Sequence, residues 1–227
     1  MDAPENKAEL LRALGRLVRG LSALFWGMPL TLVVGVQTAR TDWLRPLGIL
    51  PSLLTSGLLL YGLIQMSGFQ TRERPWRGAL EWAKLLALIN LGLSPFLFWW
   101  HFLPDYPFYQ WMVLVLAANG LLFLYVLNVV LQRLAAMLPD ETLRLETRFF
   151  AALDRYLILA TLGFVFLYWA FRIYEPLPEL VVWVLRWIEQ VRLGFVVLLV
   201  LLPLSITMAL LWKVKEVILS GVFSDAR

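Results

Sequence analysis

Few side chains in this sequence could do chemistry, and their types and spacing exclude most catalytic sites. The chain contains no Cys and a single His, His101, so it offers no thiolate nucleophile, no cysteine metal site and no pair of imidazoles. Ser94 lies on the same helical face as His101 but about 10 Å away along the helix, too far for a hydrogen bond between them. No G-x-S-x-G elbow and no glycine-rich phosphate loop occurs. We therefore predict a protein that is not an enzyme and that has no catalytic residue, metal site or cofactor.

Ionisable residues inside apolar segments would mark a transport or proton-relay site, because a charge buried in a membrane is costly unless it is paired. Glu81, Lys84, Asp154 and Arg155 all fall within the first two turns of their apolar segments. We expect them at or near the inner interface, where side chains can reach water. This pattern argues against coupled transport.

Neutral polar residues are more frequent in these segments. Asn90, Ser94 and Asn119 could surround a central polar pocket and bind a small molecule, and Asn128 carries another amide that needs a partner in hydrocarbon. The same residue types also join helices, because interhelical hydrogen bonds are common in membrane proteins. The spacing favours packing but leaves the ligand-binding alternative open.

Small residues recur at helical spacing in two segments. Ser52 and Ser56 form a small-xxx-small pair, and Ala83 and Ala87 begin a small and polar stripe that continues to Asn90 and Ser94. Small side chains allow two helix backbones to approach closely. We predict helix packing at Ser52, Ser56, Ala83 and Ala87.

The chain has eleven Trp residues, most of them near the ends of apolar segments. There an amphipathic ring sits at the level of the lipid headgroups, which predicts an aromatic belt. Trp99, Trp100 and Trp111 gather around one turn together with other aromatic residues. The alternative interpretation is that these three line the mouth of an outer-facing ligand site.

Arginines recur on one helical face at the start of a later apolar segment, at Arg144, Arg148 and Arg155. The simplest interpretation is a cationic anchor on the cytoplasmic side, paired internally with neighbouring acidic residues. The alternative is a docking face for an anionic lipid headgroup or an acidic partner.

The elements that must position these residues are membrane helices. Hydrophobic residues make up 60% of the 227 and charged residues 16%, too few to cover a water-soluble globule. A membrane span needs about 20 mostly apolar residues. Six stretches meet or approach this length: 22–38, 47–66, 79–103, 108–132, 149–173 and 191–212.

Cytoplasmic loops retain Lys and Arg, so their distribution predicts the orientation. With the N-terminus inside, fifteen of the twenty basic residues lie on the cytoplasmic side. We predict an all-α, polytopic helix bundle of about six spans with both termini cytoplasmic. A five-span alternative leaves the weak first segment on the membrane surface.

Three regions follow from this pattern. Residues 1–21 carry apolar and basic residues on opposite helical faces, which predicts a basic amphipathic helix on the cytoplasmic surface. Residues 22–219 form a single six-span domain, and 220–227 form a C-terminal tail. Residues 179–190 predict a short interfacial helix on the outer face.

Assembly with other membrane helices is the function that needs the fewest specialised residues in such a chain. We predict a multi-pass protein of a bacterial-type inner membrane that acts as a structural or accessory subunit, as a homo-oligomer or with other membrane subunits. Its surroundings are membrane lipids, and no feature predicts binding to nucleic acid. A small-molecule binding or transport protein is the alternative, because six short-looped spans are similar, in size and span number only, to the substrate-binding subunits of vitamin importers. Anionic lipid binding is the third possibility.

Overall fold

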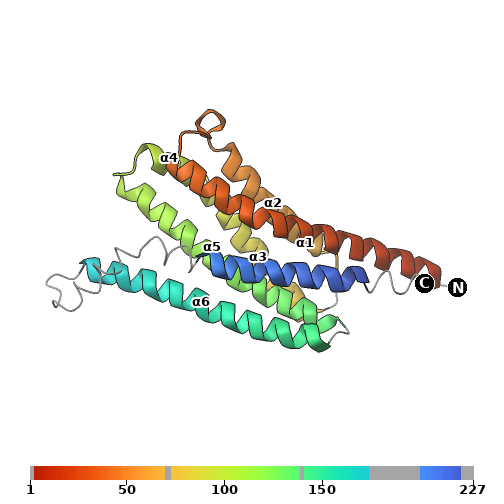
Figure 1. Ribbon diagram of the computed structural model, residues 1–227. Helices are drawn as coiled ribbons and strands as arrows, with labels where there is room; N and C mark the ends of the chain where they lie inside the picture. Colours follow the sequence, from red (N-terminus) through yellow and green to blue (C-terminus); the bar gives the residue numbers. More distant parts are fainter. Residues whose placement is uncertain (1–2, 70–72, 139–140, 174–199, 221–227) are drawn as a thin grey trace.

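A computed structural model describes residues 3–69, 73–138, 141–173 and 200–220 of the chain, and within these ranges it contains helices and no strand (Figure 1). The all-α prediction is therefore confirmed for the described residues. The helices, in chain order, are α1 (Ala3–Arg40), the 3₁₀ turn η1 (Arg45–Leu47), α2 (Leu50–Met66), α3 (Arg74–Leu93), α4 (Phe96–Phe102), α5 (Pro107–Met137), α6 (Glu141–Ile173) and a last helix over residues 200–220.

Prolines set the start of several helices. Pro51, Pro75 and Pro107 occupy the first or second position of α2, α3 and α5. A proline is favourable there because its fixed φ suits a helix and its missing N–H has no partner in the first turn. Gly48 provides the positive φ, 58°, that turns the chain from η1 into α2.

Helix α1 is continuous from Ala3 to Arg40, with Pro29 inside it. The boundary that we drew at residue 21, between a surface helix and a first span, does not correspond to a break. Leu17, Leu21 and Leu24 are fully buried and carry one apolar face across that boundary. Because the same face packs on both sides of residue 21, one straight helix buries more apolar surface than two separate helices would.

The helices pack against one another in successive pairs, and their buried apolar residues form one continuous core (Figure 1). α1 packs on α2, α2 on α3, and α3 on α5, while α6 covers the other side of α5. The 200–220 helix buries Leu210, Leu211 and Val214, and its Trp212 ring lies 5.6 Å from the ring of Phe25 on α1. α5 therefore lies between α3 and α6, and its residues contact both.

Glycines bring α1 and α2 into backbone contact. A Cβ added at Gly20 would lie 2.6 Å from the carbonyl oxygen of Gly62, and one added at Gly62 would lie 3.0 Å from the carbonyl oxygen of Gly20. No other residue fits at such a separation without moving the helices apart. This pair therefore sets how closely the first two helices approach.

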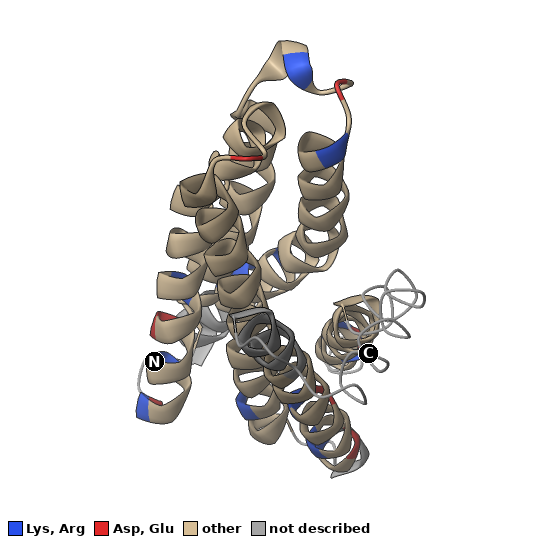
Figure 2. Cartoon of the chain, turned by 90° about the vertical axis from the view of Figure 1, so that its left-hand side faces the viewer, with Lys and Arg blue, Asp and Glu red and all other residues tan. Residues whose placement is uncertain are grey.

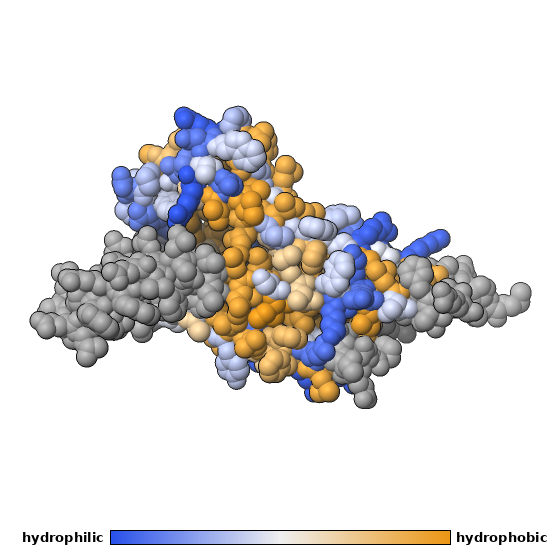
Figure 3. Space-filling view, viewed as in Figure 1, coloured by the Kyte–Doolittle hydropathy of each residue, from blue (hydrophilic) through white to orange (hydrophobic). Residues whose placement is uncertain are grey.

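Three helical stretches in the described part of the chain are long and apolar enough to cross a membrane: Leu11–Arg40, Arg74–Phe102 and Pro107–Met137. α2 is apolar but shorter. Figure 3 shows an apolar band over the middle of one face, with hydrophilic residues toward its ends. The predicted interfacial helix at 179–190 and the first part of the predicted span 191–212 lie outside the described residues.

Charged residues gather toward the ends of the helices. Figure 2 shows charged residues at the turn between α1 and α2, and others toward the opposite end of the bundle. The start of α1, the start of α3 and the end of the 200–220 helix lie toward this opposite end (Figure 1).

Candidate functional site

Asn90 and Asn119, which we expected near a central pocket, contact each other. Nδ2 of Asn119 on α5 donates to Oδ1 of Asn90 on α3 over 2.8 Å and to the backbone carbonyl of Leu86 over 2.9 Å. Both side chains are at least nine-tenths buried. Ser94 is also buried, but its hydroxyl donates to the carbonyl of Leu91 on its own helix. The two amides thus join α3 to α5, and the serine is not part of that contact.

The four residues that we expected at helix contacts are all buried. Ser52 and Ser56 are each 3% exposed on α2, and the Ser52 hydroxyl donates to that of Thr38 on α1 over 3.3 Å. Ala83 and Ala87 are at most 1% exposed on the face of α3 that carries Asn90. These four small residues therefore lie on the inward faces of α2 and α3.

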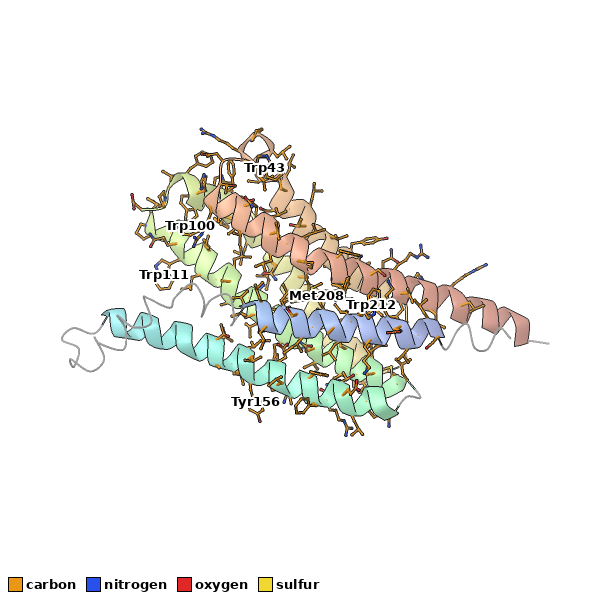
Figure 4. All side chains as sticks on the ribbon, in the orientation of Figure 1. Trp43, Trp100, Trp111, Tyr156, Met208 and Trp212 are labelled. Atoms are coloured by element: carbon orange, nitrogen blue, oxygen red, sulfur yellow. The ribbon has the colours of Figure 1, made fainter. Side chains whose placement is uncertain are left out.

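The aromatic residues at the turn between α4 and α5 pack largely on one another. The Phe96 ring lies 5.2 Å from that of Trp99 and 5.8 Å from that of Phe108, and Tyr109 contacts the rings of all three. Trp99 and Trp111 are partly exposed. Trp43, Trp100 and Trp111 lie toward the same end of the molecule (Figure 4). The turn between α4 and α5 is thus occupied by edge-to-face and tilted ring contacts.

His101 fastens α4 to the end of α1. Its Nδ1 lies 3.2 Å from the backbone carbonyl of Ala39, and its Nε2 lies 3.2 Å from Oδ1 of Asp42. With one ring nitrogen facing a carbonyl and the other a carboxylate, this histidine holds two segments together and has no serine beside it.

The three arginines of α6 differ in their contacts. Arg144 donates to the carbonyls of Ala136 and Leu138 at the end of α5. The guanidinium of Arg155 lies 5.7 Å from the ring centre of Tyr125, and both Arg148 and Arg155 are exposed. Arg144 therefore caps the end of a helix, whereas the other two remain accessible to solvent or headgroups.

A buried polar cluster that the sequence analysis did not identify joins three helices. Asp154 of α6, Asn128 of α5 and Thr207 of the last helix are at most 3% exposed, and we refer to them as the Asp154 cluster. Asn128 Nδ2 donates to Asp154 Oδ2 and, over 2.9 Å, to Thr207 Oγ1. We expected Asp154 at the inner interface, but the packing of α5 and the last helix covers it completely.

A signal for this cluster exists in the sequence. Thr147, Asp154 and Thr161 recur every seven residues along α6, and all three are buried. Seven residues are nearly two helical turns, so a polar residue at this interval marks one face. Asp154 falls near the start of an apolar segment, where a charged residue is also expected at the membrane interface. Its place in the seven-residue spacing was therefore missed.

Two shallow hollows border the last helix. One, of about 520 Å³, lies between α6 and the last helix and is lined by Leu145, Phe149, Phe150 and the Glu146–Lys213 ion pair. The other, of about 570 Å³, lies between α1 and the last helix beside Met208 and Trp212 (Figure 4). Neither is lined by Asn90, Asn119 or the aromatic residues of α4.

The outward face of α3 is apolar and open from Trp82 to Gly92, and Glu81, which is paired with Arg77, lies on the same face just before it. Trp82 and Leu88 are 64% and 57% exposed, and Leu85 and Ile89 extend the same face. Glycines lie at both ends of this stripe, Gly78 and Gly92, and a Cβ added to either would meet no atom within 4 Å. We refer to these six residues as the outer face of α3.

Comparison with known proteins returned no matching family model, no similar curated protein and no similar solved structure.

Proposed function

We propose that this chain is a structural or accessory subunit of a membrane assembly, which it joins by helix packing with a second copy or with other membrane subunits. In this proposal the chain crosses a bacterial-type inner membrane six times, with both termini in the cytoplasm. Membrane lipids cover the remaining apolar surface.

The outer face of α3 is the observation that carries the proposal. It is apolar along three turns from Trp82 to Gly92, and its terminal glycines leave open space that the side chains of a partner helix can fill. Glycines beside an exposed apolar stripe support helix packing, because a partner's side chains can enter where the glycines add none.

The positions of the other predicted residues also support assembly over small-molecule binding. Asn119 donates to Asn90, and aromatic rings pack against one another at the turn between α4 and α5. A ligand at either place would have to displace these contacts, which costs affinity. The small-molecule alternative therefore stays a prediction.

Native mass spectrometry of the full-length protein, gently extracted from its membrane, tests the proposal. We expect a homo-oligomer of defined mass or a stable complex with another membrane protein. The double variant Gly78→Leu/Gly92→Leu should shift this species toward the monomer, because two added side chains keep the partner helix away.

Gly163→Leu is the matched control. Gly163 is an exposed glycine of α6 with open space around its Cβ position, so the change adds one leucine side chain of the same kind on another helix. It should leave the oligomer unchanged. A wild-type monomer that carries one stoichiometric small molecule would refute the assembly proposal and support the binding alternative.

A further inference from the structure

The Asp154 cluster has too few hydrogen-bond donors for its acceptors. The Asn128 amide supplies two N–H groups and the Thr207 hydroxyl one O–H group. Asn128 Nδ2 lies within reach of three acceptors: Asp154 Oδ2, Thr207 Oγ1 and the backbone carbonyl of Leu124 at 3.0 Å. The Thr207 hydroxyl is shared between Asp154 Oδ2 at 3.3 Å and the carbonyl of Pro203 at 2.9 Å. With the Asp154 carboxyl group ionised, three hydrogens therefore serve more acceptors than they can satisfy.

Two oxygens of the cluster receive nothing at all. Asp154 Oδ1 and Asn128 Oδ1 are buried, and neither accepts a hydrogen bond from the described residues. Rotating the Asn128 amide would not solve this, because its oxygen would then face the carboxylate. A buried oxygen without a partner costs about 1–3 kcal/mol, and more when it belongs to a charged group.

No cationic side chain in the described part of the chain pairs with Asp154. Lys213, on the helix that carries Thr207, is paired with Glu146, and Arg148 and Arg155 are exposed. Around the cluster lie fully or nearly buried apolar residues of the three helices, among them Leu127, Ile158 and Leu211. The carboxyl group is therefore surrounded by apolar side chains and by neutral oxygen-bearing groups.

We propose that the Asp154 cluster is a binding site for a small monovalent cation, Na⁺. The ion would be held by Asp154 Oδ1, Asn128 Oδ1 and a lone pair of Thr207 Oγ1. Carboxylate, amide and hydroxyl oxygens are hard ligands, which suit an alkali cation and not a soft transition metal. One carboxylate neutralises one positive charge, whereas a divalent ion would leave a net charge in an apolar environment.

The site also has a structural consequence. Each of its three residues comes from a different helix, so an ion there would fasten α5, α6 and the last helix together. A ligand that binds the folded state alone raises its stability according to its free concentration. Na⁺ should therefore protect the protein against unfolding. This inference does not depend on the assembly proposal.

Thermal unfolding of the purified full-length protein in detergent tests the inference. Samples in NaCl, KCl and choline chloride of equal ionic strength are compared, so that general salt effects cancel. We expect NaCl to raise the midpoint saturably above choline chloride, with KCl less effective. Equal midpoints in the three salts would overturn the proposal, as would a stabilisation that follows pH but not Na⁺, which would assign the site to a proton.

Substitutions locate the effect. Asp154→Asn should abolish the Na⁺ dependence. Thr207→Val, which keeps the shape and removes one ligand oxygen, should raise the Na⁺ concentration for half the effect by about tenfold or more. Thr31→Val is the control, because the Thr31 hydroxyl also bonds the carbonyl four residues earlier, at Gly27 of α1. A Thr207→Val protein with an unchanged Na⁺ response would refute the site even if Asp154→Asn does not fold.

Discussion

Amide side chains on opposite sides of α5 connect it to both of its neighbours. Asn119 and Asn128 are nine residues apart, which is two and a half helical turns, so they point in opposite directions. Asn119 donates to Asn90 of α3, and Asn128 donates to Asp154 of α6. Each of these polar contacts specifies which face of α5 meets which helix, a role that apolar side chains alone fill less selectively.

The sequence could indicate the first of these contacts better than the second. Asn90 and Asn119 stood out because each is an amide in an otherwise apolar segment. Asp154 did not, because its proximity to charged residues is also typical of an interfacial position. The contact between Asn128 and Thr207 joins residues 79 apart in sequence, and no local spacing records such a tertiary pairing.

The amide pair should stabilise the fold by a measurable coupling. In a double-mutant cycle, Asn90→Ala and Asn119→Ala each lower the free energy of unfolding, and together they lower it by less than the sum. We expect a coupling of about 0.6 kcal/mol, and at most roughly 1.7 kcal/mol, as for other hydrogen bonds between membrane helices. Reversible unfolding in mixed detergent micelles measures it.

The control for this cycle pairs Asn119→Ala with Ser22→Ala. The Ser22 hydroxyl donates to the carbonyl of Val18 within α1, so it shares no contact with the amide pair. These two changes should be additive within about 0.3–0.5 kcal/mol. Equal additivity for Asn90 and Asn119 would contradict the assigned role of their hydrogen bond.

At the scale of the helices, hydropathy located the segments and misjudged some of their ends. The predicted span 79–103 covers most of α3 and all of α4. Helix α3 begins earlier, at Arg74, and Ser94 and Pro95 separate the two helices. The predicted segment starts late because the charged first turn of α3 lowers the mean hydropathy there. It continues through Pro95 because one proline lowers the mean hydropathy only a little. Likewise α6 begins at Glu141, eight residues before the apolar run at 149–173.

Close helix packing depends on which glycine is changed. Gly20→Ala should destabilise the protein by about 1–3 kcal/mol, because the new Cβ would lie 2.6 Å from the Gly62 carbonyl oxygen and force α1 and α2 apart. The thermal midpoint of unfolding reports the change.

Gly15→Ala provides the comparison on the same helix. A Cβ at Gly15 would meet no atom within 4 Å, so this variant gains helix propensity without a clash. Its midpoint should be equal to or above that of the wild type. If both alanine variants were equally stable, the backbone contact would not limit the approach of α1 and α2.

For the whole molecule, the order of the helices places the connecting segments alternately at two ends. The segment between α1 and α2 and the segment between α4 and α5 lie toward one end, and the start of α3 lies toward the other (Figure 1). The basic residues of the α3 and α6 starts share this second end with the basic start of α1. The sequence predicts the number of crossings from apolar length and the orientation from charge. Neither signal records how the helices pair, because that follows from side-chain contacts between distant segments.

The absence of cysteine from the whole sequence makes this topology directly measurable. Four exposed positions can each carry a single cysteine. The charge distribution predicts that Thr41→Cys and Asp105→Cys lie outside. It predicts that Glu73→Cys and Ser220→Cys lie inside. A maleimide that does not cross membranes should label the first two in intact cells and the last two only after the membrane is opened.

The cysteine-free parent protein is the control for background labelling. Labelling of Glu73→Cys in intact cells, with Thr41→Cys and Asp105→Cys labelled only after opening, would show that α1 does not cross the membrane from a cytoplasmic N-terminus and would favour five spans. With the N-terminus in the cytoplasm, labelling of Ser220→Cys in intact cells would place the end of the last helix outside and exclude an even number of spans.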